Sequence, residues 1–135
     1  MIKTAPDFIQ QFENGSASGE TFHHADHVCL AFAYLGEYPL LEALQKFCLA
    51  LKRFAAAQGK PHLYHETITY AYFFIISERM ARQAIATRQT SWEEFAATNP
   101  DLLIWKGGIL FRYYRESTLQ SALARRAFIL PDKLA

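Results

Sequence analysis

Apolar residues recur at steps of three and four positions along most of this sequence, with polar residues between them. That spacing places apolar side chains on one face of a helix. It is most regular between positions 40 and 55, where it predicts an amphipathic helix. The apolar residues of that helix are Leu40, Leu44, Phe47, Cys48, Leu51, Phe54 and Ala55.

The same spacing predicts two helices before this one. A short helix begins near Thr4, whose hydroxyl can cap it, and ends at Asn14-Gly15. The next helix ends near Gly36. Helical spacing is followed there by His24, Val28, Ala31, Phe32 and Leu35, and His24 and His27 flank the apolar stripe. Residues 15–20 are rich in Ser and Gly, which predicts a loop between the two helices.

The stretch 62–87 predicts the longest helix. From Ile68 to Ile76 almost every side chain is apolar or aromatic. A helix that is apolar on nearly all sides belongs in the interior of a fold, because no side of it is suited to water. We therefore expect this helix to be the central one.

The remainder of the chain predicts shorter helices. Ser91 followed by Glu94 is a capping box, and Asn99-Pro100 ends the helix that it starts. No alternating run beside a hairpin turn predicts a strand. The sequence thus predicts an all-α fold, with residues 1–135 as a single domain. We expect four main helices around the buried helix 62–87 and short helices that cap the C-terminal end.

The composition is typical of a globular protein, and it limits the classes of partner that the protein can bind. Hydrophobic residues make up 51% of the chain, while 14 Lys and Arg face 13 Asp and Glu. A net charge of +1 is too balanced to indicate a nucleic-acid partner. No apolar run approaches the ~18 residues of a membrane span. Cys29 and Cys48 lie within apolar patterns, which is typical of reduced thiols, so we expect a cytoplasmic protein. The sequence leaves open whether the protein forms a homodimer.

Histidines cluster at the starts of two predicted helices. His24 and His27 are three residues apart, so both can face one point. His65 can add a third nitrogen and Glu66 a carboxylate, a set that suits a divalent Zn, Fe, Mn or Ni ion. Glu66 is then a ligand, a residue that orients a ligand, or a catalytic base. The alternative is that these histidines only form hydrogen bonds within the fold.

Aromatic and polar residues near this cluster are candidates for a substrate pocket. Thr69 and Tyr72 share the helical face of His65, and Tyr113 can approach them from the C-terminal region. Together with Tyr64 these rings can line a pocket for a small apolar molecule. They can equally fill a core. Several arginines can bind phosphate or carboxylate or simply be solvated. These are Arg112, Arg115, Arg125 and Arg126.

A set of short motifs spans most of the chain. They are Phe22-x-His24-x-x-His27, Tyr64-His65-Glu66-Thr67-x-Thr69, Asn99-Pro100, Tyr113-Tyr114, Ser121-x-x-Ala124-Arg125 and Phe128-x-x-Pro131-Asp132. Together they resemble a family of short, uncharacterised bacterial all-helical proteins. The resemblance implies no particular activity. It implies only that three histidines belong together, His24, His27 and His65, with His23 and His62 as weaker members.

Two hypotheses of function follow from these residues. In the first, the protein is a metal-dependent enzyme that uses His24, His27 and His65 as ligands, with hydrolysis by metal-bound water or Fe(II) chemistry as its reaction. In the second, it is a non-catalytic module that binds a small molecule or another protein, and its histidines are structural. The sequence does not choose between them.

Overall fold

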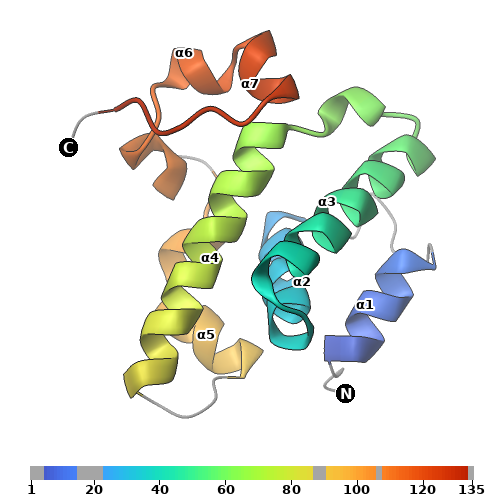
Figure 1. Cartoon of the computed structure of the whole chain (residues 1–135), viewed down its shortest axis with the longest axis vertical. Coiled ribbons are helices and arrows are strands. Elements are labelled where there is room, and N and C mark those ends of the chain that lie inside the picture. The colour runs from blue at the N-terminus through green and yellow to red at the C-terminus, as the bar shows by residue number, and fades with distance from the viewer. Residues whose placement is uncertain (1–4, 15–22, 87–90, 106–107, 134–135) are drawn as a thin grey trace. The chain divides into compact units, whose positions relative to one another are not determined.

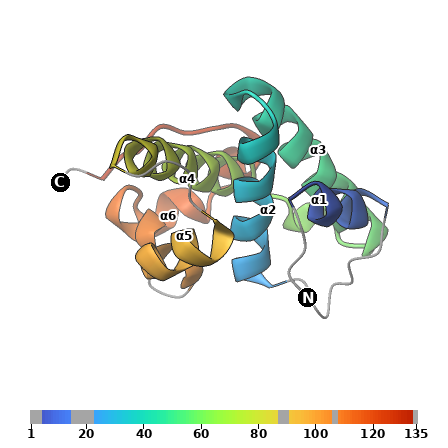
Figure 2. The same ribbon diagram turned by 90° about the horizontal axis from the view of Figure 1, so that it is seen from below.

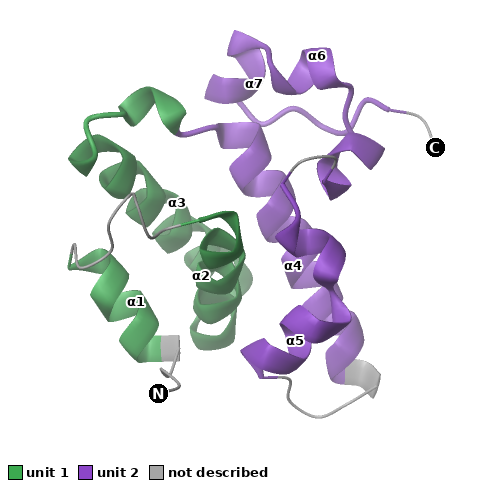
Figure 3. Cartoon of the chain, turned by 180° about the vertical axis from the view of Figure 1, so that it is seen from behind, with its two compact units in different colours: residues 1–63 green, residues 64–135 purple. Residues whose placement is uncertain are grey.

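The computed structural model describes residues 5–14, 23–86, 91–105 and 108–133, and every regular element within them is a helix (Figure 1). The predicted all-α fold is confirmed. The chain divides into two compact units, Met1–Leu63 and Tyr64–Ala135 (Figure 3). That the two units form one domain, with four main helices around the long one, stays a prediction. None of the described helices is long and apolar enough to cross a membrane.

The described residues of unit 1 form three α-helices and a 3-10 turn. They are α1 (Ala5–Glu13), α2 (His24–Glu37), α3 (Leu40–Ala57) and η1 (Pro61–Leu63). The helix α2 contacts both α1 and α3 (Figure 2). The predicted apolar faces of α1 and α3 are largely confirmed, because Ile9, Phe12, Leu44, Phe47, Cys48 and Leu51 are buried. The predicted cap Thr4 and the predicted loop 15–20 lie outside the described residues.

Tyr34 joins the three helices of unit 1. Its ring is fully buried and packs edge-on against Phe47 of α3, with 6.2 Å between ring centroids. Its hydroxyl donates a hydrogen bond of 2.5 Å to the Glu13 carboxylate of α1. Burial and this carboxylate raise the pKa of Tyr34, so the hydroxyl keeps its proton and remains a donor.

Unit 2 is built on α4 (Glu66–Ala86). The other elements are α5 (Trp92–Thr98), η2 (Pro100–Leu103), η3 (Ile109–Arg112), α6 (Glu116–Leu119) and α7 (Ala122–Arg126). The predicted start of the long helix near His62 is wrong, because His62 and Leu63 belong to the 3-10 turn η1. The predicted end, Thr87, lies outside the described residues. Ser91 caps α5 as predicted, since its hydroxyl accepts from the Glu94 amide at 3.2 Å.

The apolar middle of α4 is covered by elements from the C-terminal part of unit 2. Phe73 and Ile76 are almost fully buried, and α7 and η3 both contact α4. Phe74 is 36% exposed, so the helix is not buried on every side. Phe128 packs on this side, with its ring stacked on Tyr70 at 5.5 Å and edge-on to Phe74.

The C-terminal segment 127–133 is held to α4 by a buried threonine. Thr67 has no exposed surface, and its hydroxyl donates to the Ala127 carbonyl at 2.7 Å. The same oxygen accepts from the Ile129 amide at 3.0 Å. The Tyr114 hydroxyl donates to the Ile129 carbonyl at 2.7 Å. An extended segment without a sheet partner thus satisfies its backbone groups through side chains.

Further along, this segment is fastened to α6 and η3. The Asp132 carboxylate accepts from the Arg115 amide and from the Thr118 hydroxyl, which caps the start of α6. The Lys133 amide donates to the Tyr113 carbonyl, and its ammonium donates to the Phe111 carbonyl at 2.8 Å. The short helices and the C-terminal segment therefore close one end of unit 2, as the sequence predicts.

Replacing Thr67 by valine tests the role of its hydroxyl. Valine fills the same volume but leaves the Ala127 carbonyl and the Ile129 amide without their partner, so we expect a loss of about 1–3 kcal/mol in the free energy of unfolding. Urea titration followed by circular dichroism measures it. Thr67→Ser is the control because it keeps the hydroxyl. A serine variant as unstable as the valine variant would contradict this role.

Candidate functional site

His65 is buried at the start of α4, and both of its ring nitrogens are engaged within unit 2. Nδ1 accepts from the Ile68 amide at 3.1 Å, which caps the helix. Nε2 lies 2.7 Å from the Leu119 carbonyl. A carbonyl only accepts and an amide N–H only donates, so the proton is on Nε2 and the Nδ1 lone pair is occupied.

This arrangement affects the metal hypothesis directly. A metal ligand must direct a free nitrogen lone pair at the ion, and neither nitrogen of His65 has one in these contacts. Burial lowers the pKa of His65, the Leu119 hydrogen bond raises it, and the nearby Arg125 charge lowers it. The geometry favours the structural alternative for His65, and its role as a ligand stays a prediction.

Glu66, the candidate catalytic residue, begins α4. Its carboxylate accepts from the Tyr64 hydroxyl at 2.6 Å. A carboxylate in the first turn also interacts favourably with the positive end of the helix dipole. Both contacts explain Glu66 as a stabilising residue of the helix start. Its roles as a metal ligand or a catalytic base stay predictions.

A charged centre that the sequence did not indicate joins α4 to η2 in unit 2. Arg79 of α4 forms two parallel hydrogen bonds to the Asp101 carboxylate, at 2.7 and 2.8 Å. It also donates to the Asn99 side-chain oxygen at 3.1 Å. The Arg79 hydrogen bonds hold the pKa of Asp101 below its usual range, with a smaller contribution from Arg112. This bidentate pair fixes η2 against α4.

The candidate pocket residues differ in how far they are buried. Thr69 and Tyr72 are buried on α4, whereas Tyr113 is 40% exposed. Burial and then the Asp101 charge raise the pKa of Tyr72 to about 12. The hydrogen bonds to Asp101 raise the pKa of Arg79. A substrate pocket between Tyr72 and Tyr113 stays a prediction.

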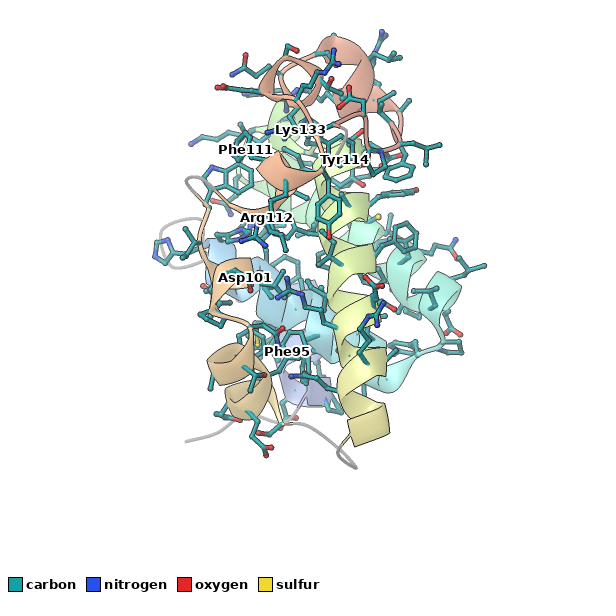
Figure 4. All side chains as sticks on the ribbon, turned by 90° about the vertical axis from the view of Figure 1, so that its left-hand side faces the viewer. Phe95, Asp101, Phe111, Arg112, Tyr114 and Lys133 are labelled. Atoms are coloured by element: carbon teal, nitrogen blue, oxygen red, sulfur yellow. The ribbon has the colours of Figure 1, made fainter. Side chains whose placement is uncertain are left out.

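Between positions 104 and 113, the described residues of unit 2 expose a set of large side chains that we call the aromatic–arginine face. It consists of Ile104, Trp105, Phe111, Arg112 and Tyr113. Ile104 is 54% exposed and Trp105 50%, while Phe111 and Tyr113 are 37% and 40% exposed. Figure 4 shows Phe111 and Arg112 on the same side of unit 2 as Asp101 and Lys133.

The backbone beneath this face is tightly packed. The Trp105 carbonyl accepts from the Gly108 amide at 3.2 Å, and the Gly108 carbonyl accepts from the Phe111 amide at 3.1 Å. The Trp105 ring lies beside the ring of Tyr72, with 6.3 Å between centroids. A Cβ at Gly108 would lie 2.6 Å from the Ile104 carbonyl and 3.0 Å from the Tyr72 hydroxyl. Only glycine permits this approach. The close packing of Gly108 against the Ile104 carbonyl and Tyr72 therefore helps to hold the backbone of the face in place.

His24 and His27 lie in unit 1, one turn apart on α2. Burial and, to a smaller extent, the neighbouring His24 lower the pKa of His27 to about 4, while Asp26 opposes both effects. His27 is therefore neutral near pH 7. The Asp26 carboxylate also accepts from the His23 amide at 2.9 Å, at the start of α2. Phe22 of the same motif lies outside the described residues.

The described residues do not bring three or more His, Cys, Asp or Glu side chains into one group that could hold a metal. Of the residues in the aromatic–arginine face and the centre below it, the sequence singled out Tyr72, Tyr113 and Arg112. It missed Arg79, Asp101 and Trp105. The one available signal was Asn99-Pro100-Asp101, a helix stop that ends in a carboxylate.

The lowered pKa of the half-buried His27 predicts a specific pH dependence. Its pKa is about 4 in the folded chain and ~6.5 when unfolded, so the unfolded state binds more protons between these values. Stability that is complete above pH ~6.5 should fall toward pH 4, by up to about 3 kcal/mol from this group. Urea titrations from pH 7.5 to about 4 measure it.

His27→Asn should flatten this part of the pH profile, and His62→Asn, at an exposed histidine, should leave it unchanged. Equal slopes for the native chain and His27→Asn would show that His27 is not the group responsible.

Comparison of the chain with protein-family models, with curated proteins and with solved structures found no match. The resemblance to a bacterial family therefore stays a prediction, and the function has to be argued from the residues themselves.

Proposed function

We propose that the chain is a non-catalytic interaction module and that the aromatic–arginine face of unit 2 docks a segment of another protein. The observation that carries this proposal is the exposure of Ile104, Trp105, Phe111 and Tyr113, which lie close to Arg112 in the sequence. Large apolar side chains gathered on a surface mark interaction sites more often than single ones do. Trp, Tyr and Arg are also the residues that contribute most to binding energy at protein interfaces.

The rigidity under the face supports a binding role. The Arg79–Asp101 pair fixes η2, and Lys133 holds the backbone of η3 through the Phe111 carbonyl. A surface that is already in its bound conformation loses little conformational entropy when a partner docks. Such a surface can bind tightly even when it is small.

The polar residues of the motifs in unit 2 form hydrogen bonds within the fold, which argues against catalysis there. The His65 ring and the Thr67 hydroxyl both have their donors and acceptors engaged in the fold. The Asn99 amide donates to the Phe95 carbonyl and its oxygen accepts from Arg79. A general acid or base must reach the proton that it transfers. Cys29 and Cys48 are not joined in a disulfide, which fits the cytoplasm as the place of action.

Selection from a library of short random peptides displayed on phage tests the proposal. The full chain should enrich related peptides, and a double variant with Trp105→Ala and Tyr113→Ala should not retain them. Removing two large rings from an interface typically weakens binding by a factor of ten or more each. Enrichment that is absent, or that is the same on the double variant, would overturn the docking role of this face.

Two controls separate docking from other effects. Leu49→Ala removes an exposed apolar residue of unit 1 and should keep the enriched peptides. Size-exclusion chromatography at increasing concentration shows whether the segment belongs to a second copy of the chain. Self-association that disappears in Trp105→Ala would identify a homodimer as the complex.

A second candidate function is metal binding through His24 and His27 of unit 1. The observation that favours it is that the His27 ring is neutral near pH 7, because burial and the nearby charge of His24 both lower its pKa. A neutral imidazole is the form that binds Zn(II) or Fe(II). The two side chains occupy one face of α2, the arrangement that paired helical ligands use. A complete site requires at least one further ligand.

Thermal denaturation with added metal tests this second function. A ligand that binds only the folded state raises the melting temperature. Zn(II) or Fe(II) should therefore stabilise the native chain and have much less effect on His27→Ala. His65→Ala should keep the metal-induced shift if His65 only caps α4. Equal shifts in the native chain and His27→Ala would exclude His27 as a ligand.

A further inference from the structure

Resting on the proposed function, we infer that the segment docked on the aromatic–arginine face is an acidic peptide and that the Arg112 guanidinium binds one of its carboxylates. The apolar side chains of the same peptide pack on Trp105, Phe111 and Tyr113. The argument depends on the charge of this part of the chain and on the state of Arg112.

The balanced net charge of the protein conceals a strong asymmetry along the sequence. Residues 105–133 contain six Lys and Arg but only two Asp and Glu. The remaining residues contain the other eight Lys and Arg and the other eleven Asp and Glu. The C-terminal part therefore carries a charge of +4 and the rest a charge of −3. The stretch that carries most of the aromatic–arginine face is therefore rich in cations, and cations attract carboxylates.

Neither carboxylate of this stretch is available to the face. Asp132 accepts from the Arg115 amide and from the Thr118 hydroxyl at the start of α6. Glu116 accepts from the Gln120 side chain at 3.1 Å, within the same short helix. Both carboxylates are therefore held at α6, and in the described part of the chain neither forms an ion pair with Arg112, the cation of η3.

Arg112 itself is exposed. Its charge reaches Asp101 and contributes to the lowered pKa of that carboxyl. The Asp101 oxygens are already bound by Arg79 at 2.7 and 2.8 Å. In the described part of the chain, no hydrogen bond or ion pair engages the Arg112 guanidinium. Its planar set of N–H donors matches a carboxylate in a two-point hydrogen bond.

The surroundings of Arg112 favour a peptide over a nucleic acid. Single-stranded nucleic acid stacks on aromatic rings within a broad basic groove, and proteins that bind it usually have strongly basic domains. The five residues of the aromatic–arginine face include one cation, Arg112, which is too few for such a groove. The face also includes Ile104, an exposed aliphatic side chain that suits leucine or phenylalanine better than a base.

Isothermal titration of the full chain with two matched peptides tests this inference. The probe is a synthetic peptide in which glutamate alternates with leucine and phenylalanine, and its control has glutamine in place of every glutamate. We expect the acidic peptide to bind roughly tenfold more tightly than the control, with an advantage that shrinks as salt screens the charges.

Three variants locate the carboxylate contact. Arg112→Gln should lose about tenfold in affinity for the acidic peptide and little for the glutamine peptide. Arg112→Lys keeps the charge but not the two-point geometry, so it should lose less. Arg82→Gln is the matched control, because Arg82 is an exposed arginine of α4 paired with Glu78. Circular dichroism verifies that each variant is folded.

The outcomes distinguish this inference from the proposed function. Equal binding of both peptides that is lost in Trp105→Ala would retain the docking face and overturn the acidic partner. Tighter binding of a single-stranded oligonucleotide than of the acidic peptide, abolished by Arg112→Gln, would also overturn the peptide. If neither peptide binds and the phage selection enriches nothing, the inference and the proposed function both fail.

Discussion

The organisation of unit 2 depends on how the buried start of α4 satisfies its hydrogen bonds. The first N–H groups of a helix have no partner within the helix, and burial removes water as a substitute. His65 supplies one acceptor by binding the Ile68 amide through Nδ1. Thr67 then connects the first turn to the C-terminal segment through Ala127 and Ile129. Without these contacts, neither the helix start nor the segment that covers it has its polar groups paired.

This use of polar residues explains why a motif with the composition of an active site can be part of a scaffold. His65 has one nitrogen for the helix and one for the Leu119 carbonyl, so its neutral form is required by structure. Glu66 and Tyr64 form a local pair at the same helix start. The requirements of a cap and of a catalytic site are similar, because both place donors and acceptors accurately in a buried environment. The hydrogen-bond partners of such residues distinguish a helix cap from a catalytic site.

The scaffold and the proposed binding surface are connected through the C-terminal segment. Tyr114 is almost fully buried and holds Ile129, while Lys133, at the other end of the segment, donates to the carbonyls of Phe111 and Tyr113. The bonds that start at Thr67 therefore continue to the backbone of the aromatic–arginine face. A substitution at the start of α4 can change binding at this face by loosening the segment, without a direct contact to any partner.

The sequence by itself determined the helical class, the main helices and several of their ends, because apolar spacing, glycine, proline and capping residues act over a few neighbouring positions. Ser91 and Glu94 are an example, since both partners of the cap lie within one turn. It placed the start of α4 wrongly because the cap residue His65 resembles a helix residue or a ligand in sequence. Only the tertiary structure decided what His65, Thr67 and Arg79 do, since Leu119, Ala127 and Asp101 are far from them in the chain. No local pattern reports such partners, because the contacts exist only once the C-terminal segments have packed on α4.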